Sequence, residues 1–337
     1  MPHIVVLDGH TVNPGDNPWS ALAELGDLTV HERSSAAEVV ARARHADIVL
    51  LNKTALGRET LAQLPQLRGV SVLATGVNSV DLDTATERGI AVCNVPAYST
   101  ASVVQHTLAL LLELCNRVGP HDVSVHAGDW QRSIDYCYWK SPLLELTGKM
   151  LGIVGYGAIG RGLAGAARAL GMNVCAAILA SSRQQVEGPD PVPRLPLDEL
   201  FRRADVISLN CPLTTETRHL VSSARLSMVK PGCLLLNTAR GGLVDEDALS
   251  AALSAGQLAG AALDVLSTEP PSAENPLLYA PNCIITPHLA WSSLPARQRL
   301  IATSVDNVRS LLLGSPIHVV NPAYTEHALG RNQSSLP

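Results

Sequence analysis

The stretch KMLGIVGYGAIGRGLAGAARALG, from Lys149 to Gly171, decides how this chain folds. Its apolar run, Met150 to Val154, passes directly into a glycine-rich turn, and an alanine-rich helical pattern follows until the last glycine. This order predicts a strand, a tight turn and a helix whose first amides can hold a pyrophosphate. The residues assigned to this dinucleotide turn are Gly155, Gly157, Ala158, Ile159 and Gly160. A glycine turn that serves packing alone is the alternative interpretation.

The next predicted strand, Asn173–Ala180, ends where an adenosine ribose would be recognised. An NAD site is expected to carry an Asp or Glu about twenty residues beyond the glycines, and this sequence has none there. Ser181, Ser182 and Arg183 follow the strand instead, and small hydroxyls beside a guanidinium suit a 2′-phosphate. We therefore expect NADP(H) to be favoured and NAD(H) to be possible. In the alternative, Arg183 is a solvated loop residue and NAD(H) is the cofactor.

Composition and charge limit the classes of protein to which the chain can belong. It has 337 residues, of which 46% are hydrophobic and 16% charged, enough for two globular domains. A net charge of −5 without a basic block argues against a nucleic-acid partner. The strand-like run Ile4–Leu7 begins without signal-peptide features, and no apolar run approaches the roughly eighteen residues of a membrane span. We expect a soluble, cytoplasmic protein without a membrane partner.

The cysteines are spaced in a way that predicts neither disulfides nor a metal site. They number seven, an odd total, and no two form a C-x-x-C pair. We expect reduced thiols that serve as small core residues, with no bound metal and no nucleophilic role. The positions are Cys93, Cys115, Cys137, Cys175, Cys211, Cys233 and Cys283.

Predicted strands alternate with helical segments on both sides of the dinucleotide turn. Before it the strands are Ile4–Leu7, Leu28–His31, Ile48–Leu51, Val70–Ala74 and Ile90–Cys93. This alternation predicts an α/β fold of two Rossmann-like, doubly wound parallel-sheet domains with an interdomain cleft. No second glycine turn occurs in the first half, which we therefore assign to substrate binding. The expected domains are a discontinuous flavodoxin-like one, 1–101 with 290–337, and a dinucleotide-binding one, 102–289.

Residues 118–147, after the predicted helix Ser102–Arg117, have the pattern of an irregular segment. They hold much of the chain's small aromatic content, at Trp130, Tyr136, Tyr138 and Trp139. An aromatic cluster in a loop is typical of a surface covered by another subunit, so we expect a homodimer. A lid packed on its own domain is the equally weighted alternative.

Polar residues follow the ends of the predicted strands of the second half. Ligands of open α/β sheets bind at the carboxyl ends of strands, so these tails are where chemistry is expected. The tails supply three ionisable residues with complementary roles, Arg240, Glu269 and His288. Other residues that we assign to the cofactor from these segments are Cys211, Pro212, Thr217, Thr238, Ala239 and Asp264, the last inside the predicted strand Gly260–Val265.

Several motifs in the same order make the chain similar to the D-isomer-specific 2-hydroxyacid dehydrogenase family over about residues 3–322. They are ATGVNSVD (74–81), the dinucleotide turn, VKPG with NTARGGLVD (229–245), Asp264-Val265 with Glu269-Pro270, and Thr286-Pro287-His288. Its glycerate dehydrogenase and hydroxypyruvate reductase members carry segments that resemble YCYWKSPLLEL (136–146) and PHLAW (287–291). The resemblance implies reversible reduction of a small 2-oxoacid of the glyoxylate or hydroxypyruvate type to the D-2-hydroxyacid.

The resemblance also implies a role for each site residue. His288 would be the general acid/base and would also contact the cofactor, Glu269 would orient its ring, and Arg240 would bind the carboxylate and the reacting carbonyl. Asp264 would face the nicotinamide carboxamide. The residues assigned to the substrate are Lys53, Thr75, Gly76, Val77 and Arg240.

Alternatives to this function stay open at the level of sequence. The chain could reduce a bulkier or phosphonate-bearing 2-oxo compound, or it could be a non-catalytic protein that senses dinucleotides. It departs from the family pattern in the missing acid after the second strand. It also has Gln105 where many members carry Glu, and nothing in the sequence explains that difference.

Overall fold

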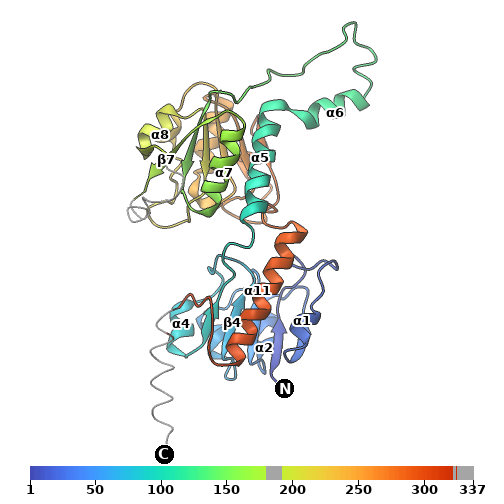
Figure 1. The fold of residues 1–337 in the computed structure, drawn as a ribbon, viewed down its shortest axis with the longest axis vertical. Helices are drawn as coiled ribbons and strands as arrows, with labels where there is room; N and C mark the ends of the chain where they lie inside the picture. The colour runs from blue at the N-terminus through green and yellow to red at the C-terminus, as the bar shows by residue number, and fades with distance from the viewer. Residues whose placement is uncertain (180–191, 322–323, 325–337) are drawn as a thin grey trace, which may run out of the picture. The chain divides into compact units, whose positions relative to one another are not determined.

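The computed structural model describes residues 1–179, 192–321 and 324, and the chain divides into two compact units. One unit comprises Met1–Ser99 and the chain from Ser292 onward, and the other comprises Thr100–Trp291. Both are built on parallel sheets with helices on their faces (Figure 1). The predicted α/β fold class with two Rossmann-like units is confirmed.

The first unit contains, among its described residues, a five-stranded sheet of order β2-β1-β3-β4-β5. Its central strand, Ile48–Leu51, is a continuous apolar run that is buried on both faces, as parallel strands usually are, whereas the edge strand Asp27–Val30 is largely exposed. The strands are β1 (His3–Val6), β2 (Asp27–Val30), β3 (Ile48–Leu51), β4 (Gly69–Val72) and β5 (Ala91–Cys93). The helices are α1 (Ser20–Ala23), α2 (Ala36–Ala43), α3 (Arg58–Ala62), α4 (Leu82–Glu87) and α11 (Leu294–Leu312).

The second unit holds a seven-stranded parallel sheet, of order β12-β11-β10-β9-β6-β7-β8 within the described chain. Its strands are β6 (Met150–Val154), β7 (Asn173–Ile178), β8 (Arg194–Pro196), β9 (Val206–Leu209), β10 (Cys233–Asn237), β11 (Leu258–Leu263) and β12 (Cys283–Ile285). Its α-helices are α5 (Thr100–Asn116), α6 (Val118–His126), α7 (Ala158–Ala169), α8 (Leu197–Arg203), α9 (Ser223–Leu226) and α10 (Glu246–Ser254). The described part of this unit also contains the 3₁₀ turns η2 (Gly241–Leu243) and η3 (Pro276–Leu278).

Two apolar cores lie on the two faces of this sheet. Leu110 and Leu163, from α5 and α7, pack with one face, and Phe201 and Leu249, from α8 and α10, pack with the other. Helix α8 approaches β6 closely because Gly152 has no side chain, and a Cβ there would lie 2.6 Å from Leu200. The sheet is therefore held rigidly on both sides, and its strand ends are fixed platforms for side chains.

Residues 118–147 differ from the irregular segment that the sequence predicts, because Val118–His126 form helix α6. The helix and the extended chain after it project away from the sheet of their unit (Figure 1). Helix α6 is hard to predict from the sequence, because its residues include Gly119 and Pro120 and show no amphipathic pattern. We call residues 118–147 the arm.

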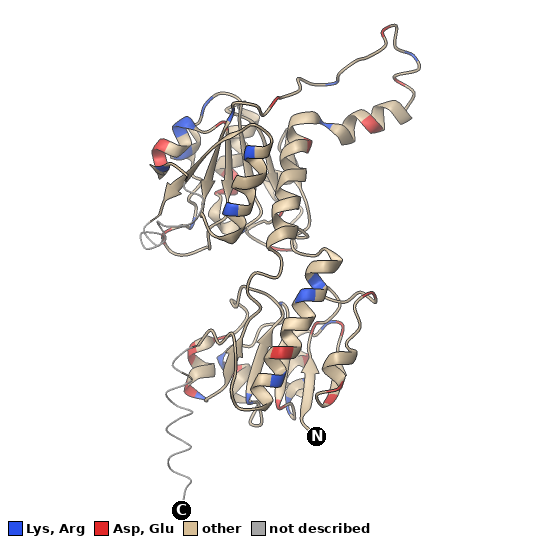
Figure 2. Cartoon of the chain, in the orientation of Figure 1, with Lys and Arg blue, Asp and Glu red and all other residues tan. Residues whose placement is uncertain are grey.

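Charged residues of both signs are intermixed along the helices and loops of the described chain, whereas the strands are largely uncharged (Figure 2). This distribution follows from burial of the strands on both faces. No helix in the described chain combines the length and the apolar character that crossing a membrane requires.

Candidate active site

Three neighbouring strands bring the predicted catalytic residues to one edge of the seven-stranded sheet. Strands β10, β11 and β12 run parallel, and their last residues are in register, Asn237 with Leu263 and Leu263 with Ile285. Arg240 follows β10, Asp264 follows β11 directly, and His288 follows β12. Asp264 thus lies just beyond its strand rather than inside it, because β11 ends at Leu263. The residues that the sequence predicts to be catalytic therefore follow the carboxyl ends of neighbouring strands, on the same edge of the sheet.

His288 and Glu269 form a hydrogen-bonded pair. The Nδ1 atom of His288 donates to Oε2 of Glu269 at 2.6 Å, while the other oxygen of Glu269 accepts from the amide of Leu266 at 3.1 Å. The two side chains keep 26% and 35% of their surface exposed, so a ligand can reach them. With Nδ1 engaged, Nε2 is the ring atom that can exchange a proton with a ligand.

The backbone at His288 is held in an uncommon conformation. Its φ is +52°, in the left-handed region, where non-glycine residues are infrequent. The amide of His288 lies 2.9 Å from the carbonyl oxygens of both Asp264 and Thr286, which accept from it. The direction of the imidazole is therefore set by the backbone of β11 and β12 as well as by Glu269.

Asp264 is a buried carboxylate, 1% exposed, that organises the chain on both sides of His288. Its oxygens accept from Thr286 Oγ1 at 2.6 Å and from the amides of Leu289 and Ala290 at 2.9 Å. His106 Nε2, on α5, lies 3.5 Å from the same carboxylate. Burial alone would raise the pKa of Asp264, but these contacts outweigh it and hold the pKa below its ordinary value.

Arg240 stands on a turn that a buried amide side chain shapes. Asn237 is completely buried, accepts from the amide of Ala239 at 3.0 Å and donates to the carbonyl of Arg240 at 2.8 Å. The next residue, Gly241, lies directly against Leu266, where a Cβ would be 1.9 Å from a backbone carbon. The turn that carries Arg240 and the loop that carries Glu269 thus pack backbone to backbone, and Arg240 itself remains exposed.

The glycine turn after β6 fits a dinucleotide. Gly155 has φ +98° and a Cβ there would lie 2.5 Å from the backbone of Asn210 and Cys211, while one at Gly160 would lie 2.4 Å from the Gly155 carbonyl. Gly157 differs, because a Cβ there would meet no described atom within 4 Å. Among the described residues no side chain caps α7, which begins at Ala158. The turn leaves open space and helix amides where a pyrophosphate would bind.

The other residues that the sequence assigns to the cofactor differ in whether the structure describes them and in how far they are buried. Ser181, Ser182 and Arg183 lie outside the described residues. Cys211 is buried, and burial raises the pKa of its thiol to about 11, so it remains neutral. Thr217 is buried too, and its hydroxyl donates to the carbonyl of Pro212 at 2.7 Å, which shapes the loop after β9.

Thr238 and Ala239 follow β10 on the turn that carries Arg240. The Thr238 hydroxyl lies 2.9 Å from that of Thr107, on α5, and both residues are partly or fully buried. The predicted strand-end residues thus lie near one edge, but several of their polar groups hold loops together.

The substrate residues predicted in the first unit follow β3 and β4, which are neighbours in its sheet. The amides of Lys53 and Thr54 donate to Asp8 Oδ2 at 2.6 and 2.7 Å, so one carboxylate shapes the loop after β3. After β4, Thr75 donates to the Val95 carbonyl at 2.8 Å. Thr75 is exposed, and Gly76 and Val77 beside it are half-buried.

Arg297, near the start of α11, is a buried side chain that pairs with an acidic residue of its own unit. It is 7% exposed, and its two Nη atoms bind the two oxygens of Asp16 at 2.5 and 2.6 Å. The Asp16 contact raises the pKa of Arg297, while the same pair lowers that of Asp16. Arg297 therefore anchors the 12–16 segment to α11 within its own unit.

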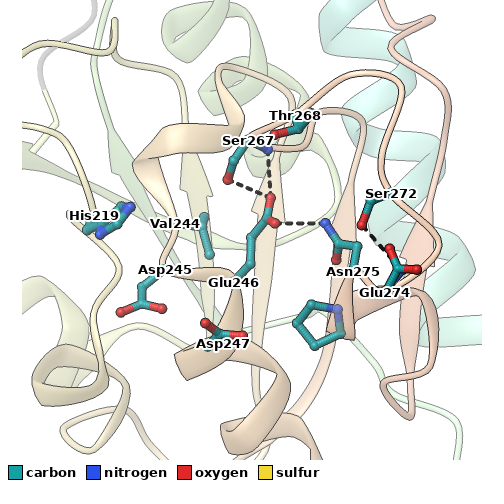
Figure 3. A pocket seen from close by; sticks show the side chains of 11 residues that line it. His219, Val244, Asp245, Glu246, Asp247, Ser267, Thr268, Ser272, Glu274 and Asn275 are labelled. Atoms are coloured by element: carbon teal, nitrogen blue, oxygen red, sulfur yellow. Dashed lines mark hydrogen bonds between the residues drawn. The ribbon is translucent and has the colours of Figure 1, made fainter.

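A cavity of about 390 Å³ lies beside the loop that carries Glu269 (Figure 3). Four carboxylates, those of Asp245, Glu246, Asp247 and Glu274, are among its lining side chains. A negatively lined cavity does not suit a carboxylate substrate or a phosphate-bearing cofactor. It is therefore not the site that the sequence predicts, although it touches the same loop.

Sequence reasoning missed the residues that hold the site in place, namely Asn237, Glu246, His106 and Asp8. Asn237 ends β10, Asp8 lies two residues after β1 and Glu246 begins α10, whereas His106 lies inside α5. The position of Asn237 is a usable signal, because a polar residue at the end of a buried strand needs hydrogen-bond partners.

Comparison with known proteins gives the chain a consistent set of relatives. Residues 108–290 match the family model "D-isomer specific 2-hydroxyacid dehydrogenase, NAD binding domain". A hydroxypyruvate reductase of Blautia hydrogenotrophica is 47% identical over 94% of this chain and 99% of its own, and a glycerate dehydrogenase of Methylorubrum extorquens is 40% identical over 84% and 88%.

A solved structure extends the comparison to the fold. The NADPH-dependent glyoxylate/hydroxypyruvate reductase of Sinorhizobium meliloti, in complex with NADP and malonate, has a TM-score of 0.81 with 29% identity. The match covers 95% of this chain and 96% of that one.

Proposed function

The chain belongs to the D-isomer-specific 2-hydroxyacid dehydrogenase family, and on that premise we propose that it reduces glyoxylate, hydroxypyruvate or a similarly small 2-oxoacid. The product is the D-2-hydroxyacid and the reaction is reversible. The observation that carries the proposal is the 2.6 Å bond between His288 and Glu269 at the edge of the sheet that also bears the glycine turn. A sensor that only bound dinucleotide would have no use for an oriented proton donor there.

His288 is the general acid of the reduction. It holds a proton at Nε2 and gives it to the carbonyl oxygen of the substrate as negative charge develops there. Glu269 accepts from Nδ1, which fixes the orientation of the ring and leaves Nε2 to exchange the proton with the substrate. In the oxidative direction His288 takes the proton back from the hydroxyl group.

Arg240 binds the substrate and stabilises the developing alkoxide. Its planar guanidinium can bind the carboxylate and the neighbouring carbonyl oxygen together, which a lysine ammonium cannot do with the same geometry. Lys53 and the segment Thr75–Val77 of the first unit complete the recognition of the carboxylate in this proposal. The division of labour follows the expected domains, with 1–101 and 290–337 for substrate and 102–289 for cofactor.

The residues of the glycine turn, Gly155 to Gly160, hold the pyrophosphate of the cofactor. When bound, a reduced nicotinamide supplies the hydride that the reaction needs. Cys211 and Pro212 border the adenosine side as apolar contacts, and Thr238 and Ala239 border the nicotinamide side. Asp264 supports the nicotinamide side through the protein rather than by a free oxygen, since its carboxylate already accepts hydrogen bonds from the residues on both sides of His288.

NADPH is the preferred reductant in this proposal. The support is the sequence Ser181-Ser182-Arg183, which lacks a carboxylate and offers a guanidinium for the 2′-phosphate. Replacing Arg183 with alanine lowers the ratio of kcat/KM for NADPH to that for NADH by about tenfold or more, as loss of a charge-assisted bond predicts. An unchanged ratio contradicts this assignment.

The protein acts as a homodimer that buries the arm. Ile134, Tyr136 and Trp139 are 99%, 89% and 69% exposed, and large apolar side chains gathered on one segment mark a protein interface. Light scattering after gel filtration gives the mass in solution, and the expected value is twice that of the chain. A Trp139→Glu variant that stays at the wild-type mass, or a monomeric wild type, contradicts the proposal.

Turnover is the test of the main proposal. Purified protein is mixed with NADPH or NADH and with glyoxylate, hydroxypyruvate, pyruvate or a phosphonate analogue, and loss of reduced cofactor is followed by absorbance. Rapid oxidation with glyoxylate or hydroxypyruvate is the expected result. Tight dinucleotide binding without oxidation by any of the four would instead identify a sensor, and turnover of the phosphonate alone would identify another substrate class.

A further inference from the structure

Glu246 is the first residue of α10 and its carboxylate points at the loop that carries Glu269 (Figure 3). One oxygen accepts from the amide and from the hydroxyl of Ser267, at 2.6 and 2.7 Å. The other oxygen accepts from Asn275 Nδ2 at 2.8 Å. Glu246 therefore binds the loop on both sides of Glu269.

The rest of the loop is anchored in ways that make these bonds consequential. Asn275 also accepts from the amide of Leu277 at 3.0 Å and so fixes the start of η3. At the other end, Leu266 packs on Gly241 and donates to Glu269 at 3.1 Å. Between these anchors the loop has no strand or helix of its own in the described chain, so side-chain contacts determine where Glu269 lies.

We propose that Glu246 is a positioning residue for the Glu269–His288 pair. It fixes the Glu269 loop much as Asp264 fixes the segment around His288, where it binds Thr286 on one side and Leu289 and Ala290 on the other. Each partner of the pair thus lies on a segment that a carboxylate holds from both sides. This inference rests on the proposed function, since it assigns Glu246 a part in the same reaction.

Other charged groups near Glu246 do not share this role. His219, Asp245, Asp247 and Glu274 line the same cavity, and Asp245 caps α10 by accepting from Ala248 at 3.1 Å. Asp247 is exposed and is the next residue after Glu246. Asp247→Asn therefore removes the same charge at nearly the same place without touching the loop, which makes it the matched control.

A reciprocal exchange tests the hydrogen bond itself. In Glu246→Gln, an amide group faces the Asn275 amide group if the Ser267 bonds persist, so two donors meet. In Asn275→Asp, two carboxylates meet. In the double variant the new amide group on α10 can donate to the new carboxylate of the loop, whose other oxygen can still accept from Leu277. The double variant restores the link with its polarity reversed.

The reaction, its pH profile and the stability of the fold are measured for each variant. Each single variant is expected to lower kcat by on the order of tenfold, with the KM for the reduced cofactor unchanged, because a misplaced catalytic group slows the chemical step. The pH dependence of kcat/KM is expected to change in each single variant, because the Glu269–His288 pair is the acid–base group that it reports. The other titratable groups near this pair are Asp264, which accepts from the amides after His288, and His106, which lies 3.5 Å from Asp264. The double variant is expected to recover most of the rate and the wild-type profile, and Asp247→Asn to match the wild type.

Two results would overturn the inference. One is a Glu246→Gln protein with the wild-type kcat and pH profile, and the other is a loss in the single variants that the double variant does not reverse. If Glu246→Gln does not fold, Ser267→Ala removes a single bond of 2.7 Å and must still lower kcat while the KM for the reduced cofactor stays unchanged. A wild type that turns over no 2-oxoacid would instead defeat the proposed function, so the two failures are distinct.

Discussion

The turn after β6 and the loops after β10, β11 and β12 reach the same edge of one sheet, but different atoms hold them in place. At the turn, close packing of backbone on backbone leaves no room for a Cβ at Gly155 or Gly160. In the loops, Gly241 also packs tightly against backbone, but buried side chains add hydrogen bonds, from Asp264 to the segment that carries His288 and from Asn237 to the turn that carries Arg240. A turn that binds a cofactor through its backbone needs residues without side chains, whereas a side chain that donates a proton needs other side chains to orient it.

The largest effect expected from breaking this arrangement is at the reacting residues themselves. His288→Ala removes the proton donor and Arg240→Ala removes the positive neighbour of the alkoxide, so each lowers kcat/KM by on the order of 10² to 10⁴. Steady-state kinetics with the preferred 2-oxoacid gives the number.

Dinucleotide binding is the control for both substitutions. Neither side chain builds the glycine turn, so affinity for the reduced cofactor, measured by its fluorescence, is expected to change far less than kcat/KM. Near-native kcat/KM in a folded variant would remove the role assigned to that residue.

A pair of glycine substitutions tests the other half of the comparison. Gly155→Ala adds a Cβ 2.5 Å from two backbone atoms at φ +98°, so the free energy of unfolding should fall by about 3 kcal/mol. Gly157→Ala meets open space and should cost less than about 1 kcal/mol, yet crowd the pyrophosphate and weaken cofactor binding. Denaturant unfolding and cofactor titration of the two variants separate fold from binding. Equal stabilities would show that the turn is not packed as described.

The same contrast explains what the sequence could predict. Met150–Val154 and the glycines encode a strand and a turn within one short stretch, so the dinucleotide-binding turn can be predicted from the sequence alone. Arg240, Glu269 and His288 are recognisable as candidates because each follows a strand or stands in a tail at one sheet edge.

Other features depend on contacts between residues far apart in the chain. Glu246 meets Ser267 and Asn275 only because α10 and the loop after β11 fold together, and Asp264 meets His106 from α5 in the same way. Helix α6 was missed for a different reason, since its apolar residues face outward and produce no periodic pattern. Pairings of this kind leave no local periodicity or motif, so the sequence predicts the elements but not their supports.

Asp264→Asn sharpens the comparison with a smaller change. One oxygen becomes an NH2 group that faces a donor, either the amide of Ala290 or the pair Thr286 and Leu289, so the free energy of unfolding should fall by about 1–3 kcal/mol near neutral pH. Thermal or denaturant unfolding across pH measures it.

The sign of the pH effect follows from the lowered pKa of Asp264. A carboxyl that loses its proton more easily in the folded state contributes stability above its unfolded pKa of about 3.9, and this is lost as the pH falls through the folded value. The gap in unfolding free energy between wild type and Asp264→Asn should therefore narrow below about pH 4. A gap that stays constant down to acid pH would mean that the charge is not what stabilises the loop.

The smallest effect on kcat is expected at Cys211, which lies beside the glycine turn and in this proposal makes only an apolar contact with the cofactor. Burial raises the pKa of its thiol to about 11, so almost none is thiolate at neutral pH, and thiolate is the reactive form. Cys211→Ala removes only a small buried side chain, so kcat should stay within about twofold while stability falls by roughly 1 kcal/mol. A loss of kcat as large as that of His288→Ala would show that a side chain beside the glycine turn takes part in the reaction. That result would contradict the distinction between a turn held by backbone packing and loops that carry catalytic side chains.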